Sequence, residues 1–72
     1  MAKHSIRAPT TGSIWIHSAG VGQRVFSGGP LLIIECMKLE IPVESPVDGT
    51  VSWLQAVGTT IAQDDLIAIV ET

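Results

Sequence analysis

Apolar residues occur along the chain in short runs, some alternating with polar residues and some continuous, and most runs end at glycine, proline, serine or aspartate. Runs of this length and pattern, bounded by turn-forming residues, are typical of β-strands. A helical period never persists for three turns, so the pattern predicts an all-β domain. The expected strands cover residues 5–8, 13–17, 24–26, 31–34, 39–43, 50–54, 58–61 and 66–70.

Two of these runs, 31–34 and 39–43, are separated by a short polar interruption near the middle of the chain. The gap accommodates only a tight hairpin, with Met37 and Lys38 at its tip. A two-residue hairpin turn favours Asn-Gly or Asp-Gly, because both central residues take a positive φ, and Met and Lys are poorly suited to it. A local choice that contradicts the local rule often marks a functional site, so this pair is the first candidate.

The alternation also predicts which side chains share a face. In the second expected strand it places Ile14 and Ile16 on one face and Trp15 and His17 on the other. Pro42 lies within the fifth expected strand. Since proline donates no hydrogen bond to a sheet, that strand is expected at a sheet edge or with a bulge at this position.

The chain contains an internal repeat. The Pro-x-x-Gly opening at Pro9 recurs at Pro46, and further matches follow at nearly constant spacing, with Trp15 and Trp53 in roughly equivalent places. The repeat predicts one domain over 1–72, made of two similar halves at about 5–38 and 39–72.

Neither half is large enough to bury its apolar face alone. We therefore expect two quasi-symmetric four-stranded halves packed together as a flattened β-barrel or sandwich. In that arrangement the hairpin at Met37 and Lys38 ends the first half and the chain terminus ends the second. The hairpin and the termini should lie at opposite ends of the domain.

Composition narrows the function classes. The formal net charge is −3, with 4 Lys and Arg against 7 Asp and Glu, so the basic footprint of a nucleic-acid-binding domain is absent. No apolar run approaches the length of a membrane span, and no signal-peptide pattern opens the chain. A single cysteine, Cys36, allows no internal disulfide and favours a reducing, cytoplasmic setting. His4 and His17 stand alone, without the spacing of a metal site.

Residues 35–39, Glu-Cys-Met-Lys-Leu, closely resemble the attachment motif of the biotin carboxyl carrier family, usually Glu-Ala-Met-Lys-Met. The resemblance extends over nearly the whole chain and includes both Pro-x-x-Gly openings. It implies the biotinyl/lipoyl-type fold, with biotin in amide linkage to Lys38. Cys36 and Leu39 depart from the usual residues and are expected to tune recognition by the ligase. The short turn at 19–23 leaves no room for the protruding thumb segment of some carriers. In this respect the chain resembles the thumbless carriers.

The resemblance implies a non-catalytic carrier that is modified by a biotin protein ligase. Such a carrier moves a carboxyl group between the biotin carboxylase and carboxyltransferase sites of a biotin-dependent carboxylase. The carboxylase is expected to be of the acyl-CoA type. Glu35, Met37 and Leu39 would be read by the ligase. No nucleic acid, membrane or metal is expected among its partners. The alternatives are a lipoyl carrier of a 2-oxo acid dehydrogenase-type complex, with lipoate on Lys38, and an unmodified adaptor. Met37 before Lys38 favours biotin, because lipoyl domains usually have Asp-Lys-Ala at the turn.

Two residues of the motif keep alternative interpretations. Glu35 is either a surface strand residue or a discriminator between ligases. Cys36 is either a small packing residue or a reactive thiol, and packing is favoured because no His or Arg stands near it in the sequence. Asp64 and Asp65 indicate a solvated turn, since too few oxygen ligands cluster there for a cation site.

Overall fold

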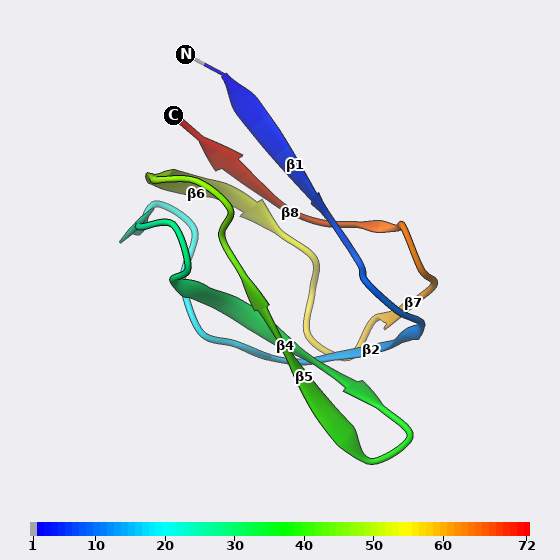
Figure 1. Ribbon diagram of the computed structural model, residues 1–72. Coiled ribbons are helices and arrows are strands. Elements are labelled where there is room, and N and C mark those ends of the chain that lie inside the picture. The colour runs from blue at the N-terminus through cyan, green and yellow to red at the C-terminus, as the bar shows by residue number, and fades with distance from the viewer. Residues whose placement is uncertain (1) are drawn as a thin grey trace.

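The computed structural model describes residues 2–72, and these residues form eight β-strands and no helix (Figure 1). The all-β prediction is confirmed. No helix among residues 2–72 is long and apolar enough to cross a membrane. The strands are β1 (Lys3–Arg7), β2 (Gly12–His17), β3 (Arg24–Val25), β4 (Pro30–Cys36), β5 (Leu39–Glu44), β6 (Gly49–Leu54), β7 (Thr60–Ile61) and β8 (Leu66–Glu71).

The strands form two four-stranded antiparallel sheets, in the orders β1-β8-β6-β3 and β5-β4-β2-β7. Exchanging the first four strands with the last four turns one order into the other, which confirms the predicted quasi-symmetry. No strand of one sheet pairs with a strand of the other in the described part of the chain. Of the two architectures expected from sequence, the sandwich is therefore correct and the closed barrel is not.

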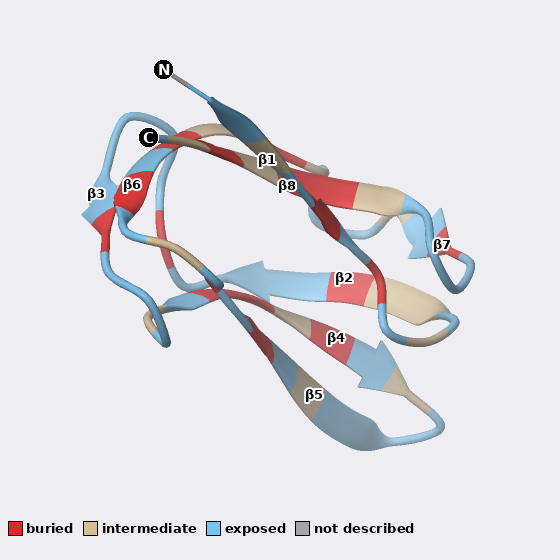
Figure 2. Cartoon of the chain, turned by 45° about the horizontal axis from the view of Figure 1, so that its top comes forward, coloured by how far each residue is buried: buried red, intermediate tan, exposed pale blue. Residues whose placement is uncertain are grey.

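The core lies between the two sheets (Figure 2). Its completely enclosed side chains are aliphatic and come from both halves of the chain. Burying such a side chain contributes about 1.5–3 kcal/mol, so a few of them stabilise a domain this small. The largest are Ile14, Leu31, Leu32, Ile34, Val51, Ile67 and Val70.

A β-bulge in β2 overturns one prediction of which side chains share a face. Ile14 pairs with Ile34, but Ile16 pairs with Ile33, so Trp15 is an extra residue opposite β4. An inserted residue shifts the alternation of all that follow. Ile14 is consequently buried while 42% of Ile16 is exposed, and the prediction that both lie on one face is wrong.

The same bulge recurs in β6, where Val51 pairs with Val70 and Trp53 pairs with Ile69. Trp53 therefore corresponds to Ile16 of the first half, and the predicted equivalence of Trp15 and Trp53 is wrong by one residue. The structurally equivalent pairs Ile14 with Val51 and Ile16 with Trp53 are each 37 residues apart, whereas the two tryptophans are 38 apart.

The domain is elongated, with extents of 35 × 18 × 18 Å. The β4–β5 hairpin projects at one end and both termini lie at the other, as predicted (Figure 1). β5 pairs only with β4 and forms the edge of its sheet, so Pro42 sits where its missing N–H is tolerated.

The hairpin is closed by two residues in the left-handed region, Met37 with φ 50° and Lys38 with φ 67°. Cys36 and Leu39 pair on either side of them, which makes this a two-residue turn of type I′. A left-handed conformation costs a residue with a side chain about 1–2 kcal/mol. The β4–β5 ladder, which runs back to Pro30 and Glu44, holds the two residues in it.

Two glycines at equivalent places permit neighbouring strands of the same sheet to approach closely, Gly12 on β2 against β4 and Gly49 on β6 against β8. A Cβ on Gly12 would lie 2.8 Å from Ile34 Cγ2, and a Cβ on Gly49 would lie 2.8 Å from Val70 Cγ1 and against the Glu71 carbonyl. Neither backbone position has a positive φ, so close contact and not conformation is what requires glycine here.

We expect Gly49→Ala to lower the free energy of unfolding by about 1–3 kcal/mol, because the added methyl group overlaps the backbone of β8. Urea denaturation measures this. Gly20→Ala is the matched control, since a Cβ there meets nothing within 4 Å. Equal stability of the two variants would contradict the close approach.

We expect the double substitution Met37→Asn with Lys38→Gly to raise the free energy of unfolding by about 1–2 kcal/mol, because Asn-Gly relieves the left-handed strain at the turn. Thermal and urea unfolding test this. Gln63→Gly is the control: its φ is not positive, so added flexibility there should destabilise the domain. No gain in stability in the double variant would show that the turn is unstrained.

Candidate lysine modification site

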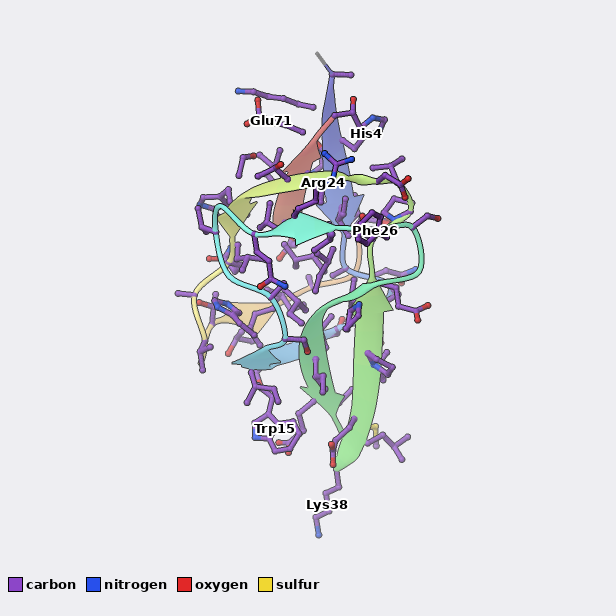
Figure 3. All side chains as sticks on the ribbon, turned by 90° about the vertical axis from the view of Figure 1, so that its left-hand side faces the viewer. His4, Trp15, Arg24, Phe26, Lys38 and Glu71 are labelled. Atoms are coloured by element: carbon purple, nitrogen blue, oxygen red, sulfur yellow. The ribbon has the colours of Figure 1, made fainter. Side chains whose placement is uncertain are left out.

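The candidate site is the tip of the β4–β5 hairpin, where sequence analysis placed it. Both residues of the turn are exposed, and 90% of the Met37 surface is accessible. The Lys38 side chain extends away from the body of the domain, at the end opposite His4 and Glu71 (Figure 3). The structure therefore presents a primary amine to an approaching active site, on a rigid support of paired strands.

Leu39 follows the turn and leaves 66% of its surface exposed. With Met37 it forms an apolar margin on both sides of the Lys38 backbone. Apolar side chains this exposed contribute nothing to the core, and exposed Met is well suited to recognition because its flexible side chain adapts to a partner. The predicted recognition residues Glu35, Met37 and Leu39 thus all lie at the surface within the same hairpin.

Cys36 differs from its neighbours because it is half-buried, on the face of β4 that also carries the buried Ile34. Its Sγ lies 4.0 Å from Thr10 Oγ1, at the limit of a hydrogen bond to sulfur. These contacts support the interpretation of Cys36 as a packing residue that connects the hairpin to the turn after β1.

A pair of like charges lies directly behind the turn. Glu35 and Glu40 are register partners on β4 and β5, and both are exposed. Like charges opposite each other in a sheet are destabilising. The corresponding pair at the other end of the domain is Lys3 with Glu71, which have opposite charges.

Sequence analysis missed Glu40 as a member of this site. The signal was available, since a two-residue turn at Met37 and Lys38 places Glu40 opposite Glu35. The two quasi-symmetric ends thus provide an internal comparison: the end that carries Lys38 keeps a repulsive pair, while the end that carries the termini does not. A conflict with local stability at one end only is expected of a functional surface.

Among residues 2–72, no group of three or more His, Cys, Asp or Glu side chains is placed to hold a metal ion. In the turn before β8, Asp65 Oδ2 accepts a hydrogen bond from the Ala62 amide at 2.8 Å. Asp64 adopts a positive φ of 73° in that turn. These contacts agree with the turn expected there from sequence.

Known proteins resemble this chain in sequence and in fold. The profile of the Biotin_lipoyl family, described as "Biotin-requiring enzyme", matches residues 4–70. The chain is 36% identical over 66 residues to the "Biotinylated protein TB7.3 homolog" of Mycobacterium leprae, covering 90% of this chain and 93% of that protein. It is 37% identical over 67 residues to pyruvate carboxylase of Staphylococcus aureus, covering 92% of this chain.

The solved structure of Kluyveromyces lactis urea carboxylase contains the same fold, with a TM-score of 0.92 and 29% identity over 99% of this chain. The chain spans about 6% of that carboxylase and about 6% of the S. aureus pyruvate carboxylase. The match to the family over residues 4–70, with the fold and a lysine hairpin that agree with it, shows that the chain belongs to the Biotin_lipoyl family of biotin-requiring enzymes.

Proposed function

We propose that the chain is a biotin carrier, in which Lys38 bears biotin and serves a biotin-dependent carboxylase. The observation that carries the proposal is the position of Lys38, an exposed amine at the tip of a strained two-residue turn beside the exposed Met37. Membership of a biotin-requiring family supports it. The residues fit the group, because an amide at Lys38 Nζ stands clear of the domain and needs no rearrangement of the strands.

Attachment forms a bond between Lys38 Nζ and the carboxyl carbon of an activated biotin, such as a biotinyl adenylate, and breaks the bond from that carbon to the activating group, which leaves. Only the neutral amine is a nucleophile, so the Lys38 ammonium must first lose a proton. The activated biotin and the proton acceptor come from a ligase, because Lys38 stands free in solvent. Acylation removes one positive charge and takes the formal net charge from −3 to −4.

The carrier contributes position and not catalysis. When bound, biotin supplies the ureido nitrogen on which a carboxyl group is carried. The hairpin holds the attachment point at the end of the long axis of the domain, and tethering keeps the carried group at high effective concentration near each active site it visits. The partners proposed are a biotin carboxylase and a carboxyltransferase, and the acceptor proposed is an acyl-CoA.

Two further parts of the proposal concern the type of carrier and its setting. We propose a carrier without a thumb; in support, a tight turn connects β2 and β3, in which the Gln23 amide donates to the Gly20 carbonyl at 3.1 Å. A reducing, cytoplasmic compartment is proposed from the single cysteine. The division into halves at about 5–38 and 39–72 follows the exchange of strand order between the sheets.

Recognition by the ligase is proposed to depend on Glu35, Met37 and Leu39, with Glu40 as an additional acidic contact. Supporting this, Met37 and Leu39 expose apolar surface without a folding role, and the glutamates form a like-charge pair beside the turn. A partner with a basic rim around an apolar contact would cover the exposed apolar surface and would neutralise the repulsion between the two glutamates.

We expect mass spectrometry of the chain, after co-expression with a biotin protein ligase, to show the gain of one biotinyl group. Lys38→Arg should abolish the gain, because arginine keeps the charge and lacks the nucleophilic amine. Lys3→Arg is the matched control, since Lys3 is the only other lysine in the sequence, and it should leave modification intact. A lipoyl mass on Lys38, or a biotinyl mass that persists in Lys38→Arg, would contradict the proposal.

We expect Leu39→Ala to slow biotinylation at limiting carrier concentration by roughly fivefold, the equivalent of about 1 kcal/mol for a recognition side chain. Met37→Ala should act in the same direction. Val21→Ala is the control, because Val21 is exposed to the same 66% as Leu39 but lies in the β2–β3 turn. Equal rates for Leu39→Ala and Val21→Ala would remove Leu39 from the recognition surface.

A further inference from the structure

A shallow groove of about 460 Å³ lies beside the turn of the hairpin, where β4 ends and β2 and β7 begin, and Gly12 and Cys36 form part of its lining. Its lining includes Met37, Glu35, Ser13, Thr11 and Thr60, and most of the lining surface is apolar.

The register of the sheet shows where the groove leads. Ser13 pairs with Glu35 of β4 on one side and with Thr60 of β7 on the other, so these three residues form a row across three adjacent strands. Since neighbouring strands are about 4.8 Å apart, the row spans about 10 Å of sheet. Met37, the residue before Lys38, closes the near end of the groove.

We propose that this groove is a resting site for the biotinyl group attached to Lys38, an inference that rests on the function proposed above. A group attached to Lys38 is held close to the groove, because Lys38 directly follows Met37 of the groove lining. The chemistry of the lining also suits a biotinyl group. A bicyclic ureido group has apolar faces, two N–H donors and one carbonyl acceptor, and the groove offers the counterpart of each.

Glu35 supplies the acceptor, since its carboxylate takes a hydrogen bond from a ureido N–H. Three residues of the lining, Thr11, Ser13 and Thr60, carry hydroxyl groups, which are possible donors for a ureido oxygen. Met37 supplies a polarizable apolar surface, now 90% exposed, that gains cover when the groove is filled. Hydrogen bonds to a charged carboxylate are the stronger kind, so Glu35 is the main polar contact.

Acylation itself changes the preference of the Lys38 side chain. As a free ammonium it is strongly hydrated and extends into solvent, away from the domain (Figure 3). The amide formed at Nζ carries no charge and adds apolar surface, so the modified side chain gains by folding back against Met37. The groove is open and shallow, so the contact is weak enough to release the arm to a partner active site.

The test is NMR of the complete chain, uniformly labelled with ¹⁵N and ¹³C, before and after biotinylation by a ligase. We expect amide shift changes at Thr11, Ser13 and Thr60, and nuclear Overhauser effects from biotin ring protons to the Met37 and Thr60 methyl groups. Shift changes confined to residues 36–39, without such effects, would overturn the resting site. Failure of the ligase to modify the chain would instead count against the proposed function.

Thr60→Trp fills the groove from an exposed position on β7 and should abolish these Overhauser effects. It should also speed capture by streptavidin roughly twofold or more, because a resting state that is half populated halves the fraction of biotin free to bind. Thr50→Trp is the matched control, an exposed threonine on β6 outside the groove, and should leave both measurements unchanged. Equal capture rates for the two biotinylated variants would overturn the inference.

Discussion

The ladder between β4 and β5 holds Met37 and Lys38 in a backbone conformation that neither residue favours. An antiparallel pair with the right-handed twist of a sheet closes over two residues through a type I′ or II′ turn, and the type I′ turn found here needs a positive φ at both residues. Pairing continues from Cys36 and Leu39 back to Pro30 and Glu44. The hydrogen bonds of this long ladder offset the conformational free energy that the two turn residues cost. The exposed amine of Lys38 is a consequence of that constraint, since a tight turn directs its side chains outward.

The quasi-two-fold arrangement gives the molecule two ends built on one plan. At each end a glycine allows the neighbouring strand of its own sheet to pass closely, and a bulge follows it in the same strand. Close approach and bulge are therefore properties of the fold and say nothing about chemistry. What differs between the ends is informative: one has a turn and a pair of glutamates, and the other has the termini and the pair of Lys3 with Glu71.

The residues that stabilise the fold differ from those proposed to bind a partner. The core is made of aliphatic side chains from both sheets, and among residues 2–72 the one buried polar residue is Ser45, whose hydroxyl donates to the Val47 carbonyl at 2.6 Å. The hairpin contributes its inner face to that core through Ile34 and leaves its outer end unsupported. The exposed apolar surface at Met37 and Leu39 and the like-charge pair of Glu35 and Glu40 do not stabilise the fold, and the proposed recognition by a ligase would account for both.

Sequence by itself determined the strands, the repeat, the hairpin and Lys38 as the candidate site, because each depends on short-range patterns: alternation, turn residues and the spacing between them. Only the tertiary structure decided the rest. The bulge that exposes Ile16 leaves no mark on the alternation of residues, since Trp15 is itself a good strand former. Whether the two sheets close into a barrel or stay open as a sandwich depends on strand pairing far apart in the chain. Thr11, Glu35 and Thr60 line the groove beside Met37 and come from distant parts of the chain. Their proximity depends on strand pairing, which no local sequence pattern reveals.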